Sequence, residues 1–139
     1  MEKFSVLLVD DEEDFLRTII KRLNKRGIQA QGASRGEQAL AMLAETPRDI
    51  VVLDVKMPEM NGLEVLKKIK ESWPTTEVIM LTGHASIDSA MEGMECGAYD
   101  YLMKPADLED LLYKLEDAYR KKVLSERQAE QGPQDTVDS

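Results

Sequence analysis

The amino-acid sequence predicts an α/β fold in which five parallel strands alternate with helices. Wholly apolar runs, such as residues 50–53 and 78–81, are typical of strands that are buried on both faces. Stretches with apolar residues at helical spacing separate these runs, and the links between the elements are short. Alternating strands and helices with short links favour parallel strands joined by right-handed crossovers.

The first strand and the first helix are predicted from the start of the chain. Residues 4–9 form an apolar run that ends in five consecutive acids. The last three of these, Glu12, Glu13 and Asp14, are expected in the first turn of the helix, where the helix dipole favours negative charge. Gly27 is expected to end this helix.

Two more strands and a second helix follow. Residues 28–32 predict a short, weaker strand at an edge of the sheet. Ser34 and Glu37 have the spacing of a capping box, so a second helix is expected to start there and to end before Pro47. Residues 50–53 then form the strand expected at the centre of the fold.

The second half of the chain repeats the pattern. A helix is expected from Gly62 to about Ser72, a fourth strand at residues 78–81, and a helix from about Ile87. Residues 99–103 predict the fifth strand. Asp107 is expected to cap the last helix, whose apolar residues face the core.

Composition limits the class of protein. The 139 residues indicate one folded domain at residues 1–121, and residues 122–139 are polar enough to predict a disordered tail or the start of a linker. A single cysteine forbids an internal disulfide and suits the cytoplasm. The first residues do not form a signal peptide, and nothing approaches a membrane span. With 18 basic and 27 acidic residues, a net charge of -9 argues against direct nucleic-acid binding.

Reactive side chains follow four of the predicted strands. Asp10 and Asp11, Asp54, Thr82 and Lys104 each stand at a strand's carboxyl end, and in a parallel sheet these ends share one edge. Singly, such residues usually cap turns. Together, three converging carboxylates predict a Mg²⁺ or Mn²⁺ site, since without a cation they would raise one another's pKa. The lysine and the hydroxyl suit a phosphoryl group carried by an Asp.

These residues resemble the receiver domain of two-component response regulators over residues 4 to about 120. The resemblance is carried by Asp10-Asp11, Asp54, Met57-Pro58, Asn61-Gly62, Thr82-Gly83 and Lys104-Pro105. It implies a flavodoxin-like (βα)5 sandwich, with the strands in the order 2-1-3-4-5 and helices on both faces of the sheet. It also implies that Asp54 is the phosphoacceptor for a sensor histidine kinase or a phosphotransfer protein.

The resemblance further implies roles at the site. Asp11, Asp54 and the backbone carbonyl of Lys56 would ligate Mg²⁺, with Asp10 acting through water. Thr82 and Lys104, as catalytic residues, would contact the phosphoryl oxygens. The list of site residues is therefore Asp10, Asp11, Asp54, Lys56, Thr82 and Lys104.

Switching and modulation are also implied by the resemblance. Thr82 and Tyr101 would act as the switch, Lys56 and His84 would modulate phosphoryl lifetime, and the Lys104-Pro105 peptide bond would be cis. Phosphorylation would then alter a protein-interaction face, with a phosphorylation-dependent homodimer as one hypothesis. Such a domain is not an enzyme beyond its own phosphorylation and dephosphorylation. Its downstream partner is not visible in the sequence.

Three alternatives remain at this point. A flavin-binding protein would need a phosphate loop rich in Ser, Thr and Gly where Asp10-Asp11-Glu12 stands. A hydrolase of the dehalogenase type would need a second Asp where Lys56 stands. A receiver fold used as a scaffold without phosphorylation is disfavoured by the complete set of acids.

Overall fold

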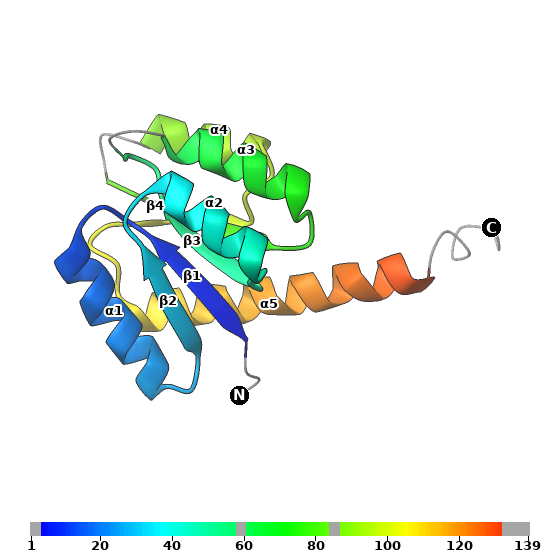
Figure 1. Cartoon of the computed structure of the whole chain (residues 1–139), viewed down its shortest axis with the longest axis horizontal. Coiled ribbons are helices and arrows are strands. Elements are labelled where there is room, and N and C mark those ends of the chain that lie inside the picture. Colours follow the sequence, from blue (N-terminus) through cyan, green and yellow to red (C-terminus); the bar gives the residue numbers. More distant parts are fainter. Residues whose placement is uncertain (1–3, 58–60, 84–86, 132–139) are drawn as a thin grey trace.

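The computed structural model describes residues 4–57, 61–83 and 87–131. Strands and helices alternate along the whole of this chain (Figure 1). In order they are β1 (Ser5–Val9), α1 (Glu13–Lys25), β2 (Gln29–Ala33), α2 (Gly36–Glu45), β3 (Ile50–Asp54), α3 (Gly62–Ser72), β4 (Glu77–Thr82), α4 (Ile87–Glu95), β5 (Asp100–Met103) and α5 (Leu108–Gln131).

The five strands form one parallel sheet in the order β2-β1-β3-β4-β5. This order confirms the predicted flavodoxin-like arrangement, and β2 lies at an edge as the sequence indicates. Leu53 near the end of β3 pairs with Val9 of β1 and with Met80 of β4. The register therefore brings the ends of these three strands to the same edge of the sheet.

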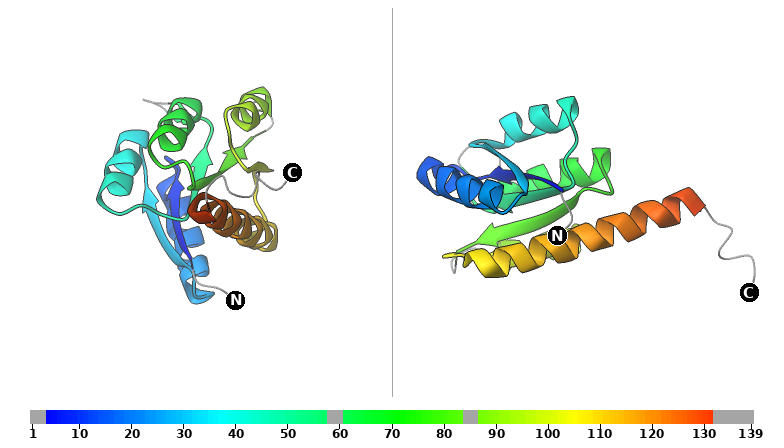
Figure 2. Two further views of the ribbon diagram at one scale, coloured as in Figure 1. Left: turned by 90° about the vertical axis from the view of Figure 1, so that its right-hand side faces the viewer. Right: turned by 90° about the horizontal axis from the view of Figure 1, so that it is seen from below.

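Two hydrophobic cores lie on opposite faces of the sheet. Alternate strand residues point to opposite sides, so Val6 and Leu8 pack with α1 and α5, whereas Leu7 and Val9 pack with α2, α3 and α4. Figure 2 shows this division, with α1 and α5 on one side of the strands. Every residue of β3 is buried, which explains its unbroken apolar run.

The capping-box prediction at Ser34 and Glu37 is wrong. Helix α2 begins at Gly36, its N-cap is Arg35, and that residue makes no side-chain capping hydrogen bond. Instead, the Gln38 side-chain oxygen accepts hydrogen bonds from the backbone N–H and the hydroxyl of Ser34, at 3.0 and 3.4 Å. The N-cap of α2 is therefore Arg35, one residue after the predicted Ser34.

Helix α5 is longer than predicted. The sequence pattern predicts a disordered polar tail from residue 122, but the helix continues to Gln131 and projects beyond the sheet (Figures 1 and 2). Lys122 is buried, and its Nζ lies 3.2 Å from Asp49 Oδ1 and 2.6 Å from Glu126 Oε2. The pair with Glu126 has the i,i+4 spacing of a helix and is visible in the sequence, but the contact with Asp49, which ties this part of the helix to the sheet, is not. Residues 132–139 lie outside the described chain.

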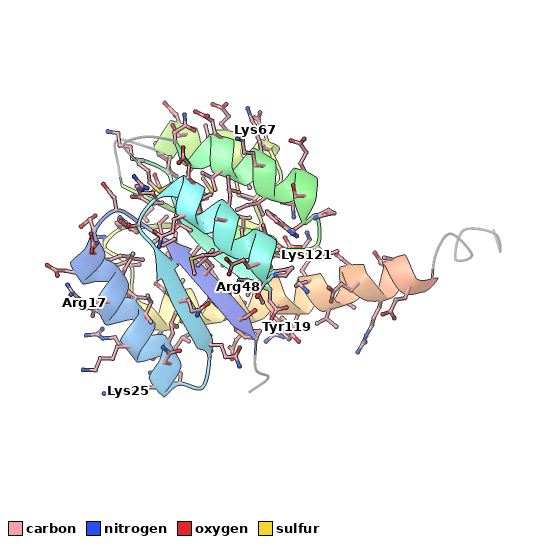
Figure 3. All side chains as sticks on the ribbon, viewed as in Figure 1. Arg17, Lys25, Arg48, Lys67, Tyr119 and Lys121 are labelled. Atoms are coloured by element: carbon pink, nitrogen blue, oxygen red, sulfur yellow. The ribbon has the colours of Figure 1, made fainter. Side chains whose placement is uncertain are left out.

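A second ion pair holds α5 at the same edge of the sheet. Lys121, labelled in Figure 3, places its Nζ 3.0 Å from Oε2 of the buried Glu77 at the start of β4. Asp49, which precedes β3, also accepts hydrogen bonds from the backbone N–H and hydroxyl of Ser5, at 2.9 and 3.2 Å. The amino ends of β1, β3 and β4 are thus tied to α5 by charged and polar contacts.

Charged side chains cover the outer surfaces of the helices. Figure 3 shows Arg17 and Lys25 on the outer side of α1 and Lys67 on α3. Among the described helices, none combines the length and the apolar composition that crossing a membrane requires.

Candidate functional site

Three acids meet at the carboxyl ends of β1 and β3. Asp10 follows β1 and is 1% exposed, Asp54 is the last residue of β3 and is 7% exposed, and Asp11 is exposed. Each can offer one carboxylate oxygen such that all three oxygens lie within 4.8 Å of one another. The two strands are neighbours in the sheet, so their ends bring these carboxylates together from distant parts of the chain.

Lys104 enters this group from the loop after β5. Its Nζ lies 2.7 Å from Asp10 Oδ2 and 3.7 Å from Asp54 Oδ2. The backbone N–H of Lys104 donates to the carbonyl oxygen of Thr82 at 2.8 Å, which fixes the loop to the end of β4. The Lys104-Pro105 peptide bond is cis.

The environment of Asp54 opposes its ionisation. Burial, and after it the charges of Asp10 and Asp11, outweigh the opposing effect of Lys104 and raise the pKa of this carboxyl from 3.8 to about 6. The backbone N–H of Lys56 donates to Asp54 Oδ1 at 3.3 Å and also lowers the pKa. At neutral pH, Asp54 is therefore an anion in a site short of positive charge.

Lys104 remains charged in this site. Burial lowers the pKa of Lys104, but the hydrogen bond to Asp10 and the charge of Asp54 outweigh that effect and raise it overall. A single ammonium group cannot balance three carboxylates. The group therefore fits a divalent cation with hard oxygen ligands, and Asp10, Asp11 and Asp54 are the residues that could hold it.

The other predicted residues lie around this centre. Thr82 ends β4 and is fully buried, and its hydroxyl donates to the carbonyl oxygen of Gly83 at 3.0 Å. Tyr101 in β5 is half-buried and packs against the core under α2, α3 and α4. The Lys56 backbone lies beside Asp54, and its carbonyl as a metal ligand stays a prediction. His84 lies outside the described residues.

Two contacts of Lys104 are not evident from the sequence. Glu12, expected in the first turn of α1, is instead its N-cap, and its Oε1 lies 3.1 Å from Lys104 Nζ. The Phe15 ring lies under the same ammonium group, 5.1 Å from Nζ to the ring centroid. Only the position of Glu12 directly after the acid pair could have indicated its role.

The loop between β3 and α3 depends on a glycine. The side chain of Asn61 caps α3 by accepting the backbone N–H of Glu64 at 3.0 Å. A Cβ atom on Gly62 would lie 2.5 Å from the carbonyl oxygen of Asp54 and 2.9 Å from Cα of Val55. Gly62 therefore lets α3 begin directly against the backbone of Asp54 and Val55.

Known proteins are similar to this chain in sequence and in fold. The family model described as response regulator receiver domain matches residues 6–116. The regulatory protein AtoC of Escherichia coli K12 is 37% identical over 106 residues, which are 76% of this chain and 23% of AtoC. The transcriptional regulatory protein ZraR of Klebsiella oxytoca is 36% identical over 132 residues, which are 95% of this chain and 30% of ZraR. The chain thus spans less than a third of either relative.

Solved structures agree with the sequence relatives. A response regulator receiver domain protein from Clostridium thermocellum has a TM-score of 0.83 and 35% identity, covering 87% of this chain and 98% of that one. NtrX from Brucella abortus has a TM-score of 0.87 and 28% identity, covering 94% of this chain and 30% of that one. From the matched residues and the shared fold, we conclude that this chain belongs to the receiver domain family of two-component response regulators.

Proposed function

We propose that the domain accepts a phosphoryl group on Asp54 in a Mg²⁺-dependent reaction and passes the signal on through a protein-interaction face. The observation that carries this proposal is the arrangement around Asp54. Its carboxylate is buried at a strand end, beside two further acids and 3.7 Å from the ammonium of Lys104. An anion so placed can attack phosphorus while fixed positive charge offsets the charge on the transferred group.

The proposed step is a direct displacement. A carboxylate oxygen of Asp54 forms a bond to the phosphorus of a phosphohistidine, while the phosphorus–nitrogen bond breaks and its electron pair returns to the imidazole. Lys104 offsets the charge of the phosphoryl oxygens, and Thr82 is placed at the adjacent strand end to donate its hydroxyl. Mg²⁺ bound by Asp10, Asp11 and Asp54 would supply further charge neutralisation at these oxygens.

The proposed switch involves β5 and the loop after it, which carries Lys104. The new phosphoryl group offers acceptor oxygens to Thr82 and Lys104, and movement of these residues would let Tyr101 turn inward. The half-buried state of Tyr101 and of the whole of β5 supports a strand that can adjust. A homodimer formed through the neighbouring helices is part of this proposal, and so is modulation by Lys56 and His84.

The partners follow from family membership and chain length. A receiver domain implies a sensor histidine kinase, or a phosphotransfer protein, as the phosphodonor. AtoC and ZraR are regulators more than three times as long as the matched segment, so an output function elsewhere in a longer protein is also a proposal. The single cysteine and the acidic composition support a cytoplasmic location without direct nucleic-acid binding by this domain. We propose no catalytic turnover beyond the phosphorylation and dephosphorylation of the domain itself.

The test is the intact mass of the protein after incubation with acetyl phosphate, with and without Mg²⁺. We expect a gain of one phosphoryl group that requires Mg²⁺ and is lost in Asp54→Asn. Asp88→Asn, which removes an exposed acid from α4, is the matched control and should still gain the group. The result that would contradict the proposal is no gain from acetyl phosphate or from histidine kinases while Mg²⁺ still binds. That result would favour a scaffold that works without phosphorylation.

A further inference from the structure

We infer that Glu12 is a positioning residue that competes with the phosphoryl group for Lys104. This inference rests on the proposed function of Asp54. In the unmodified protein, the ammonium of Lys104 lies 3.1 Å from Glu12 Oε1 and 2.7 Å from Asp10 Oδ2, but 3.7 Å from Asp54 Oδ2. The lysine thus bonds to the acids after β1 and stops short of hydrogen-bond distance to the acceptor.

The backbone holds Glu12 in place for this contact. As the N-cap of α1, Glu12 donates its backbone N–H to Asp10 Oδ1 at 2.9 Å, and its carbonyl accepts from Leu16 at 3.0 Å. Its side chain makes no capping hydrogen bond. The Glu12 carboxylate is therefore available to Lys104. Asp10, which also pairs with Lys104, helps to hold the backbone of Glu12 in place.

The strength of the contact suits a reversible competitor. The Glu12 side chain is 65% exposed, whereas Asp10 is 1% exposed. An ion pair with one exposed partner is weak and is easily exchanged for water, whereas the buried pair with Asp10 is not. On phosphorylation, Lys104 would keep Asp10 and give up Glu12.

The geometry of the ammonium group explains why giving up Glu12 matters. A lysine ammonium has three donors, and two of them serve Asp10 and Glu12. The Phe15 ring lies close to the ammonium, 5.1 Å from Nζ. Because Nζ lies 3.7 Å from Asp54 Oδ2, we expect a hydrogen bond from the third donor to a phosphoryl oxygen on Asp54 to draw Nζ toward β3 and to lengthen the contact with Glu12. Removing the Glu12 carboxylate should therefore favour the phosphorylated arrangement.

The experiment compares Glu12→Gln with Glu13→Gln. Both remove one charge from adjacent exposed residues, but Glu13 makes no ion pair or hydrogen bond with Lys104. The probe is beryllofluoride with Mg²⁺, a phosphoryl mimic, titrated by NMR, and the rate of phosphorylation by acetyl phosphate is measured by mass. We expect Glu12→Gln to bind the mimic about two- to fivefold more tightly than wild type, the range that a weak ion pair allows. Glu13→Gln should stay near the wild-type value.

A second readout does not depend on phosphorylation. The ¹⁵N signal of the Lys104 Nζ in unmodified protein should shift in Glu12→Gln and should stay in place in Glu13→Gln. Glu12→Ala, which removes the acceptor oxygens altogether, should bind the mimic at least as tightly as Glu12→Gln.

Two failures can be told apart. If wild type takes up neither beryllofluoride nor a phosphoryl group, the proposed function of Asp54 fails. If wild type takes them up but Glu12→Gln binds the mimic no better than Glu13→Gln, the role of Glu12 is refuted. The same holds if the Lys104 signal does not move.

Discussion

Replacing Asp54 with Asn should stabilise the fold, because the site holds this carboxylate at a cost in stability. The pKa of Asp54 is raised from 3.8 to about 6, chiefly by burial. The folded protein therefore binds a proton more readily than the unfolded chain, and stability falls as the pH rises through this window. The ionised Asp54 lowers the free energy of unfolding by about 3 kcal/mol at pH values well above 6, and by about 2 kcal/mol at pH 5.5. Asn has a similar shape and no charge to bury.

The assay is urea unfolding, followed by circular dichroism in EDTA at pH 5.5, 6.5 and 7.5, all above the isoelectric pH of 4.7. Asp54→Asn should exceed wild type in free energy of unfolding by up to about 3 kcal/mol at pH 7.5, and by less at pH 5.5. Asp88→Asn, an exposed acid in the first turn of α4, should lose less than about 1 kcal/mol instead. Adding Mg²⁺ should narrow the gap by stabilising wild type. The reasoning is refuted if Asp54→Asn is no more stable than wild type at pH 7.5.

Three further predictions concern the amino edge of the sheet, the start of α3 and the edge strand. Lys122→Met should lose about 1–3 kcal/mol of stability and speed amide exchange in α5 beyond residue 120, because Asp49 loses its cationic partner. Arg127→Met, at an exposed position on the same helix, should change neither. Gly62→Ala should lose about 1–3 kcal/mol of stability by urea unfolding and slow phosphorylation, because its Cβ would lie 2.5 Å from the Asp54 carbonyl oxygen. Gly93→Ala should be tolerated, because its Cβ would meet only side-chain atoms of Met80 and Leu63, at 3.4 Å or more. Asn24→Ala should lose about 1 kcal/mol of stability, because Asn24 Oδ1 accepts a hydrogen bond from the backbone N–H of Ala30 in β2 at 3.0 Å.

The sheet, and the gathering of acids at the carboxyl ends of its strands, were predictable because strands buried on both faces can be arranged in few ways. A run such as residues 50–53, apolar at every position, has no solvent-facing side and can only lie inside the sheet. Once the strands are parallel, an acid directly after such a run must lie at the carboxyl edge. Asp10 and Asp54 therefore reach one site by topology alone, and the family resemblance added the strand order that brings Lys104 to them.

Contacts made by long polar side chains were not predictable in this way. Ser34 lies one residue before the N-cap of α2. The spacing of Ser34 and Glu37 cannot determine which residue is the N-cap, because the exact start of a helix is not fixed by such a pattern. Lys122 appears in the sequence as one more charge in a polar tail. Its burial depends on Asp49, which the fold brings to the same edge from a distant position. The contact between Glu12 and Lys104 likewise exists only because the fold places the loop after β5 beside the start of α1.

The two edges of the sheet differ in how well their charges are balanced. At the amino edge, Asp49 and Glu77 face Lys122 and Lys121 of α5, so each acid has a cation within 3.2 Å. At the carboxyl edge, Asp10, Asp11 and Asp54 lie near one lysine of the described chain, Lys104, so a bound metal ion or a phosphoryl group on Asp54 would change the charge balance there. We expect a charge change at Asp54 to leave the attachment of α5 intact and to act on the loop that carries Lys104. On phosphorylation, we therefore expect amide exchange to change in β5 while the middle of α5 stays protected. Equal changes in β5 and α5 would contradict the idea that the two edges respond separately.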